Sequence, residues 1–222
     1  MPLRCFVACC LLGVTANLVS AEELHVAEFQ EGARPKNWSV NFGHWEPENG
    51  VLVCRQLDAD NHPAASRWQI PLTDGVITCR LKFVGAKGFH IGFDPVAGQL
   101  EQHKGHLYSL VVSPGQVSLK KHRNKADELS KDATLGTASF NAGSEWIHIE
   151  VRASGNEVVA ILKQGTQTAE LRASHPSFHV AKPAVVFRTM GGDAHLDDVT
   201  VQVTKPGLPV RSVKKPDVKQ PE

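Results

Sequence analysis

The sequence predicts an all-β protein, a sandwich of two antiparallel sheets packed face to face. Apolar and polar residues alternate with a period of two along most of the chain, as they do in strands that bury every second side chain. Turn-forming residues punctuate this alternation, for example at Asp74-Gly75, Ser113-Pro114-Gly115 and Gly191-Gly192. Hardly any segment shows the period of an amphipathic helix. Many short strands separated by such turns are typical of a β-sandwich.

Individual strands can be placed by the same alternation. The segments that show it are 75–83, 88–94, 145–153, 156–165, 184–190 and 199–203. The residues predicted to face the core are Ile77, Cys79, Leu81 and Phe83 in the first segment, Phe89, Ile91 and Phe93 in the second, and Ile147, Ile149 and Val151 in the third.

Residues 1–21 form a predicted signal peptide. Arg4 precedes an apolar run from Cys5 to Leu12, and Val19-Ser20-Ala21 has small residues where signal peptidase requires them. A membrane anchor is the alternative, but Thr15 and Asn17 interrupt a stretch already short of the ~20 apolar residues of a membrane span. We therefore expect cleavage after Ala21, a secreted or periplasmic protein, and no integral membrane segment once the signal is removed.

The remaining chain divides at residue 203. Residues 22–203 contain all the alternating segments and form the predicted sandwich domain. Residues 204–222 hold four prolines and five basic residues with little to bury, so we expect a disordered tail.

The charge of the chain gives no reason to expect a nucleic-acid partner. The sequence has 24 basic and 23 acidic residues, and removal of Arg4 with the signal peptide leaves 23 of each. A nucleic-acid binder needs a concentrated positive field. Here the basic residues are scattered except in Lys120–Lys125, which we interpret as a solvated edge or turn.

Two cysteines, Cys54 and Cys79, remain after the signal peptide is removed. Both lie in segments that read as strands, and an exported protein meets an oxidising environment. A disulfide would close a loop of about 25 residues and contribute roughly 3 kcal/mol. Two buried free thiols are the alternative, because the spacing does not prove that the two are adjacent.

Longer segments resemble a known superfamily. AEFQEGARPKNWSVNFGHWEPENGVLVC, WIHIEVRASGNEVVAIL and VVFRTMGGDAHLDDVTV resemble the concanavalin A-like lectins and glucanases over about residues 27–203. More narrowly, the opening element with Trp45, Gly50 and Leu52 and the closing element Phe187–Thr189 with Asp197–Val199 are similar to secreted bacterial domains related to the 3-keto-disaccharide hydrolase family. The resemblance implies an antiparallel jelly-roll β-sandwich. The narrower family further implies a hydrolase or lyase acting on oxidised disaccharides.

The catalytic motifs of these families are missing. Neither the Asn-Ser-Gly-Ile-like strand nor the Leu-Gln-Asp-His-Gly-like segment of the hydrolases is present. Retaining glucanases need two carboxyl groups ~5 Å apart. The only acidic pairs at alternate positions, Glu46 with Glu48 and Asp58 with Asp60, are predicted to lie in loops. No Ser-His-Asp order or Cys-x-x-Cys pair indicates a nucleophile or a zinc site. Whether the chain is an enzyme stays open.

Five polar residues are the candidate ligand-binding residues: His90, Asp94, His106, Tyr108 and Arg188. His90 and Asp94 alternate onto one face of a strand, ~13 Å apart at ~3.3 Å per residue, which is too far for one ion but suits successive sugar units. His106 and Tyr108 contribute if they reach the same sheet. Arg188 is expected to face outward, where its planar guanidinium suits a sugar hydroxyl or an acid. The alternative is that all are ordinary surface residues.

The closing segment Val185–Val203 reads as a hairpin around Gly191-Gly192. The acidic pair Asp197-Asp198 cannot be buried without partners. Leu196 and Val199 both suit the core yet are three residues apart, which requires a β-bulge. We expect the acidic pair to accept backbone N–H bonds or to pair with a basic residue. A calcium site is the alternative, since Ca²⁺ takes carboxylate oxygens.

The sequence therefore leaves two functions. The first is an exported, non-catalytic domain that binds carbohydrate or another cell-surface glycan through the groove of a concave sheet. The second is a hydrolase or lyase on 3-keto-disaccharides. Binding needs only a groove with aromatic and polar groups, whereas catalysis needs a convergent cluster of titratable residues. The sequence offers candidates for the groove and none for the cluster, so we prefer binding.

Overall fold

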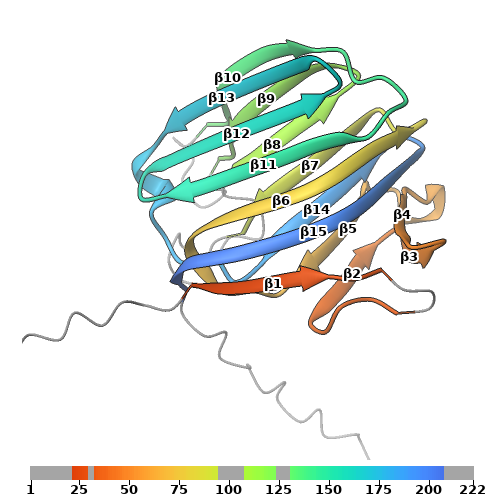
Figure 1. Ribbon diagram of the computed structural model, residues 1–222, viewed down its shortest axis with the longest axis horizontal. Helices are drawn as coiled ribbons and strands as arrows, with labels where there is room; N and C mark the ends of the chain where they lie inside the picture. Colours follow the sequence, from red (N-terminus) through yellow and green to blue (C-terminus); the bar gives the residue numbers. More distant parts are fainter. Residues whose placement is uncertain (1–21, 30–32, 95–107, 124–130, 208–222) are drawn as a thin grey trace, which may run out of the picture.

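The computed structural model describes residues 22–29, 33–94, 108–123 and 131–207, and these fold into two packed β-sheets (Figure 1). The signal-peptide prediction and His106 fall outside these residues, as does most of the predicted tail. Fifteen strands and two short 3-10 helices, η1 (Asp58–Asp60) and η2 (Pro176–Phe178), make up the described part. None of its helices is long and apolar enough to cross a membrane.

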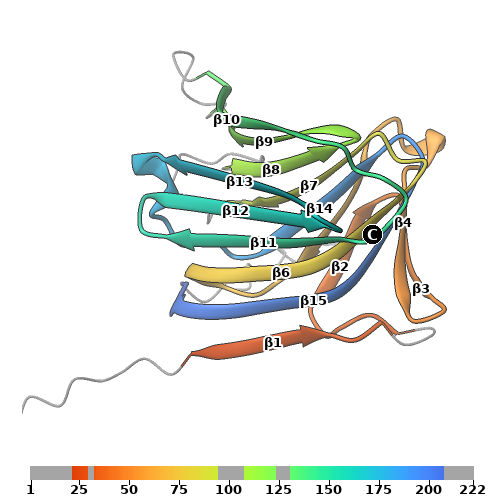
Figure 2. The same ribbon diagram turned by 45° about the horizontal axis from the view of Figure 1, so that its top comes forward.

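The first sheet, here called sheet A, has the strand order β13-β12-β11-β6-β15-β4-β3, and β1 also pairs with β15. Its strands are β1 (Glu23–Ala27), β3 (His44–Glu48), β4 (Val51–Arg55), β6 (Leu72–Val84), β11 (Ile147–Ser154), β12 (Glu157–Gln164), β13 (Gln167–Ser174) and β15 (Asp193–Pro206). Every pairing between these strands is antiparallel. Strand β1 lies along the end of β15 that β4 leaves uncovered (Figure 2).

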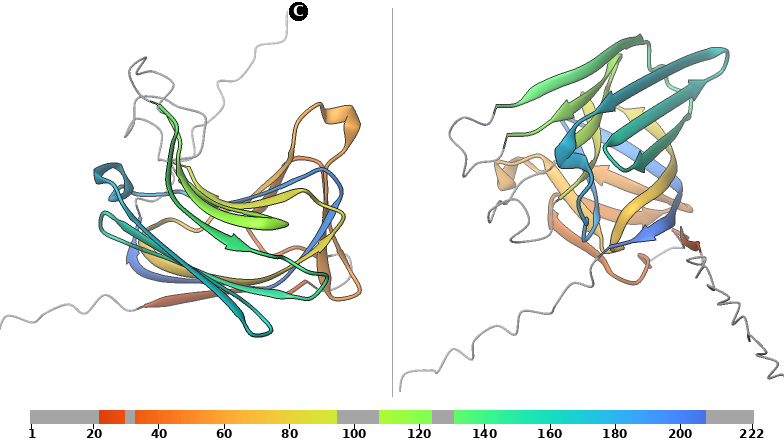
Figure 3. Two further views of the ribbon diagram at one scale, coloured as in Figure 1. Left: turned by 90° about the horizontal axis from the view of Figure 1, so that it is seen from above. Right: turned by 90° about the vertical axis from the view of Figure 1, so that its left-hand side faces the viewer.

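The second sheet, sheet B, has the order β10-β9-β8-β7-β14-β5-β2. Its strands are β2 (Trp38–Phe42), β5 (Ala64–Trp68), β7 (Gly88–Phe93), β8 (Tyr108–Ser113), β9 (Gly115–Lys121), β10 (Ala133–Phe140) and β14 (Val185–Met190). Sheet B is curved, and its hollow side is turned away from sheet A (Figure 3, left). We call this outward side of sheet B the concave face.

The alternation predicted from sequence builds the core between the sheets. Nine of the ten residues predicted to point inward are at most 3% exposed; the tenth, Phe83, packs against the core and is partly buried. Trp38 of β2 stacks on Phe187 of β14, with ring centroids 5.2 Å apart and ring planes 4° apart. The prediction of an all-β sandwich of two antiparallel sheets is confirmed.

The closing segment is not a hairpin, which corrects the sequence prediction. Strand β14 belongs to sheet B and β15 to sheet A, so Gly191 and Gly192 carry the chain across from one sheet to the other. Both have positive φ, 70° and 91°, and a Cβ on Gly192 would lie 2.4 Å from the carbonyl oxygen of Gly85. Only glycine fits so close a crossing. As a result, side chains that point outward from β14 and from β15 reach opposite sides of the molecule.

The predicted bulge in β15 is present. The register against β6 shifts between Asp197 and Thr200, and Asp198 has a φ of 47°. Leu196 and Val199 are both fully buried. The extra residue lets two apolar residues three apart fill the core, as expected for a bulge.

Strand β15 continues past the predicted domain boundary at residue 203. Lys205 pairs with Asp74 and Pro206 with Leu72, and the N–H of Gly207 donates to the carbonyl of Pro71. These residues are ordered because β6 supplies partners for their backbone. The predicted disordered tail can therefore begin no earlier than residue 208.

Cys54 and Cys79 are both buried and both free, so the disulfide does not form. Strand β15 lies between their strands β4 and β6, and the register places Cys54 level with Phe83, four residues along β6 from Cys79. The two backbones are therefore farther apart than the ~10 Å of two strand spacings. A disulfide requires Cα atoms within ~7 Å. Burial raises the pKa of both thiols, that of Cys79 to about 12.

Candidate functional site

The strand register gathers the polar side chains of the concave face into two rows. One row runs Phe42, Ala65, Arg188, His90 across β2, β5, β14 and β7, and the next runs Ser39, Arg67, Val186, Gly92, Ser109. Neighbouring strands lie ~4.8 Å apart, so residues distant in sequence become neighbours. Along these rows the planar side chains of Phe42, Arg188, His90 and Arg67 are interspersed with the smaller buried residues Ala65, Val186 and Gly92.

A hydrogen-bonded network on this face joins β2 and β5 to Asp94, the residue that follows β7. The Arg67 Nε donates to Asp94 Oδ2 at 2.8 Å, and Arg67 Nη1 donates to Asn41 Oδ1. The side chains of Arg67 and Asp94 are 30% and 15% exposed, which leaves each partly accessible. We call Asn41, Arg67 and Asp94 the polar network.

Arg188 lies diagonally across from Arg67, and its environment disfavours its charge. Partial burial lowers the pKa of the Arg188 guanidinium, and repulsion by Arg67 lowers it further, while Asp94 partly offsets both. Among the described residues, no group accepts a hydrogen bond from this guanidinium or forms an ion pair with it.

An aromatic pair stands at the edge of the concave face. The Phe42 ring stacks on His62, which follows η1, with centroids 4.2 Å apart and planes 29° apart. Phe42 is 41% exposed. Its position is fixed locally, because Gly43 turns the chain with a φ of 78° and its N–H donates to Asp60 Oδ2 of η1 at 2.6 Å.

The structure separates the five predicted site residues. His90, Asp94 and Arg188 all belong to the concave face, and His106 lies outside the described residues. Tyr108 instead points into the core, 2% exposed, with its ring 4.9 Å from that of Phe93. Alternation explains this, because Tyr108 pairs with the inward Phe93. Tyr108 is therefore left out of the site.

Sequence reasoning missed the residues that complete the site: Asn41, Phe42, His62 and Arg67. In Ala64–Trp68 the inward Ser66 and Trp68 alternate with Arg67, so its outward direction was readable. Nothing local, however, indicated that β5 lies beside β14 and therefore brings Arg67 to Asp94.

A Ser-His-Asp order that the sequence analysis overlooked also lies near this face. Ser109 Oγ is 2.9 Å from His122 Nε2, and His122 Nδ1 is 3.8 Å from Asp132 Oδ1. The second distance exceeds a hydrogen bond, and Ser109 is fully buried. A nucleophile must be reachable by its substrate, so this arrangement does not make a catalytic triad.

The two acidic pairs weighed for glucanase chemistry have other roles. Glu46 lies on edge strand β3 and accepts a hydrogen bond from Arg34 at 2.7 Å. Asp60 is held by the N–H of Gly43. Neither pair reaches the polar network through any contact among the described residues.

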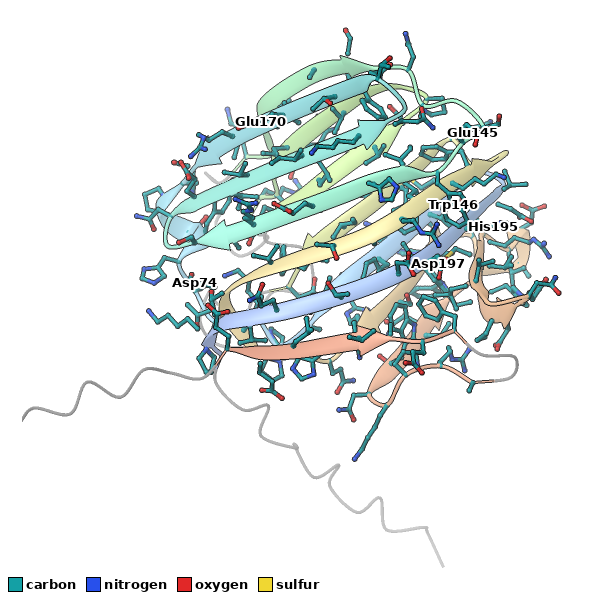
Figure 4. The ribbon with its side chains drawn as sticks, viewed as in Figure 1. Asp74, Glu145, Trp146, Glu170, His195 and Asp197 are labelled. Atoms are coloured by element: carbon teal, nitrogen blue, oxygen red, sulfur yellow. The ribbon has the colours of Figure 1, made fainter. Side chains whose placement is uncertain are left out.

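The outer face of sheet A holds a second hollow, a shallow depression of about 340 Å³ lined by Arg80, His148, Glu150 and Lys163 among others. Arg80 pairs with Asp197 at 2.5 Å and with Asp198 at 2.6 Å, and its guanidinium lies over the Trp146 ring at 5.0 Å. Figure 4 labels Trp146 and Asp197 on this face. The acidic pair therefore has the basic partner expected from sequence. No group of three or more metal-ligating residues occurs in the described part of the chain.

No protein-family model and no curated protein matches the sequence. Solved structures do match. A carbohydrate-binding module, CBM66 from Bacillus subtilis, superposes with a TM-score of 0.57 at 14% identity, over 75% of this chain and 95% of the module. Lectin I from Ulex europaeus, in complex with the methyl glycoside of α-L-fucose, gives 0.59 at 10% identity, over 83% and 99%. A Bauhinia forficata lectin in complex with GalNAc gives 0.52 at 10% identity, over 82% and 98%.

The fold is the concanavalin A-like jelly roll. This is the jelly-roll fold that the resemblance of the sequence to the concanavalin A-like superfamily implies. The narrower resemblance to the 3-keto-disaccharide hydrolases is not shown, since no family model matches.

The two outer faces of this jelly roll differ in how their charges are compensated. On sheet A, Arg80 faces Asp197 and Asp198, and Arg152 pairs with Glu150. On sheet B, Arg188 has no such partner among the described residues. Arg188 is therefore a charged group of the concave face that the described residues leave without an ion-pair partner, unlike Arg80 and Arg152 of sheet A.

Proposed function

We propose that this protein is an exported, non-catalytic carbohydrate-binding jelly roll whose ligand lies on the concave face. The observation that carries the proposal is an exposed aromatic ring, Phe42, beside a network of planar polar side chains on a curved sheet. An aromatic ring packs against the apolar face of a sugar, and planar amide, carboxylate and guanidinium groups hydrogen-bond to its hydroxyls.

The structural neighbours support carbohydrate as the ligand class. One is named as a carbohydrate-binding module, and two lectins hold a fucoside and GalNAc. Their shared fold makes a sugar the first ligand to test. The site itself, however, is argued from Phe42, the polar network and Arg188 of this chain.

Chemistry favours binding over hydrolysis at this face. Glycoside hydrolysis requires two carboxyl groups placed around one bond. Among the described residues Asp94 supplies the one carboxylate of the polar network, and Arg67 holds it. A carboxylate paired with arginine stays ionised, which suits a hydrogen-bond acceptor better than a general acid.

Affinity gel electrophoresis tests the proposal, with the purified protein run through gels that contain one polysaccharide each. We expect retardation in at least one gel and a loss of about fivefold in affinity for Phe42→Ala, because an exposed ring contributes about 1 kcal/mol of stacking. Leu24→Ala is the matched control, since Leu24 is also exposed, at 62%, but lies on β1 of sheet A. Equal retardation of all three proteins would contradict the assigned face.

The alternative function is tested in parallel by incubating the protein with a 3-keto-glucoside. Release of the aglycone that depends on Asp94 would replace binding by catalysis as the function. Export is tested by fractionating cells that produce the full chain, where loss of residues 1–21 from the exported protein is the expected result.

A further inference from the structure

The arginines of the described chain are paired with carboxylates almost throughout. Six of them, Arg34, Arg55, Arg67, Arg80, Arg152 and Arg172, form ion pairs. Arg123 is exposed, so water can solvate it. Arg188 is the exception, being half-buried on a central strand with no carboxylate of the described residues as its partner.

The groups around Arg188 do not compensate its charge. Its neighbours across β5 and β7 are Ala65 and His90. The nearest carboxylate, Asp94, is already held by Arg67, which itself repels Arg188. Among the described residues, two guanidinium groups thus lie near one carboxylate, and they leave an excess of positive charge in a partly desolvated position.

We propose that Arg188 receives the acidic group of an acidic saccharide, with Arg67 adding to the positive field. The inference rests on the proposed function and specifies the class of sugar. A planar guanidinium matches a carboxylate or sulfate group with two parallel N–H donors, which a neutral hydroxyl cannot use as well.

The strand register sets the spacing between the aromatic and the charged side chain of this site. Phe42 and Arg188 belong to the same row, two strand spacings or about 10 Å apart, with Ala65 between them. Ala65 carries only a methyl group, so no large side chain stands between Phe42 and Arg188 in the row. A sugar ring against Phe42 can therefore direct the acidic substituent of its own or a neighbouring unit to Arg188.

The test compares acidic polymers with neutral counterparts of the same backbone. The probes are polygalacturonate with its carboxyl-reduced form, and dextran sulfate with dextran. Each is offered in affinity gels to the wild-type protein, Arg188→Gln, Arg188→Lys and Arg152→Gln. Arg152→Gln is the matched control because it removes the same charge from the exposed outer face of sheet A.

We expect one acidic polymer to be retained over its neutral counterpart, and Arg188→Gln to weaken this retention ~10- to 100-fold, the usual effect of a charge-assisted hydrogen bond. Arg188→Lys should lie between, and Arg152→Gln should behave as wild type. The polygalacturonate pair reports a carboxylate, and the dextran sulfate pair a sulfate ester.

Other outcomes distinguish a failure of the acidic ligand from a failure of carbohydrate binding in general. Equal retention of acidic and neutral forms, unaffected by Arg188→Gln, would overturn the acidic ligand and leave carbohydrate binding intact. Equal loss in Arg152→Gln would reduce the effect to general charge attraction and overturn the site. Retention of none of the four polymers would overturn the acidic ligand and count against the proposed function.

Thermal unfolding gives a readout that needs no ligand. If Arg188 is kept for binding, replacing it with glutamine relieves repulsion and desolvation, and the variant should unfold at a higher temperature than wild type. A lower unfolding temperature would show that the guanidinium stabilises the fold and would overturn the inference.

Discussion

Replacing Lys182 with methionine should abolish a gain of stability that the wild-type protein shows at alkaline pH. The Lys182 side chain is fully buried, with its Nζ donating to the carbonyl oxygens of Thr73 at 2.5 Å and Val180 at 2.8 Å. Burial lowers the pKa of this amine to about 8, against an ordinary value of 10.5, while Asp74 raises it and Lys205 lowers it.

The sign follows from proton counts. Between pH 8 and 10.5 the unfolded chain keeps the proton on Lys182 and the folded chain does not, so folding becomes more favourable as pH rises. The difference of about 2.5 pKa units corresponds to roughly 3 kcal/mol in full, and to about 1 kcal/mol by pH 9. The neutral amine still has two N–H donors for its two carbonyls.

Urea unfolding followed by tryptophan fluorescence measures this at pH 7, 8, 9 and 10. Cys54, Cys79 and Tyr108 also affect the free energy of unfolding in this range, in the opposite direction. Burial raises their pKa in the folded protein, so the unfolded chain loses these protons first and stability falls as pH rises. The quantity to follow is therefore the wild-type free energy of unfolding minus that of Lys182→Met. Lys163→Met, at an exposed position of β12, is the matched control. A difference that stays constant with pH would refute the reasoning.

Two further predictions concern thiols and calcium. In the native protein Cys54 and Cys79 should resist a thiol reagent such as DTNB, because burial keeps them protonated, and both should react after unfolding in urea. One or no reactive thiol in urea would instead support the disulfide. Calcium at residues 197–198 stays a prediction: the ion must displace Arg80, so calorimetry should detect tighter Ca²⁺ binding in Arg80→Gln than in wild type, and absence of binding in both would count against the site.

The sequence predicted the layers of this fold well because alternation is a local signal. Ile77, Phe89, Ile91 and Ile149 were assigned to the core by their place in a period-two pattern, and all are at most 2% exposed. The bulge in β15 could be predicted for the same reason, because two residues three positions apart can both face the core only if an extra residue interrupts the alternation.

The order of the strands within each sheet could not be predicted from the sequence, and this order decides which side chains meet at the site. Alternation shows that Arg188 points away from Phe187, but not which strands flank it. The glycine pair before β15 suggested a hairpin, whereas the chain crosses between sheets there and sends Arg188 and Asp197 to opposite faces. Likewise, Ala133–Phe140 forms β10 because β9 supplies partners for its backbone.

The sequence by itself determined which residues form strands and which side of each strand is buried, because these depend on neighbours one and two positions away. Only the tertiary structure decided that β5, β14 and β7 lie side by side, and hence that Arg67 takes Asp94 and leaves Arg188 without a carboxylate among the described residues. The physical reason is that strand pairing joins segments about 90 to 125 residues apart through backbone hydrogen bonds. These bonds are the same for every sequence and leave no mark in the local pattern.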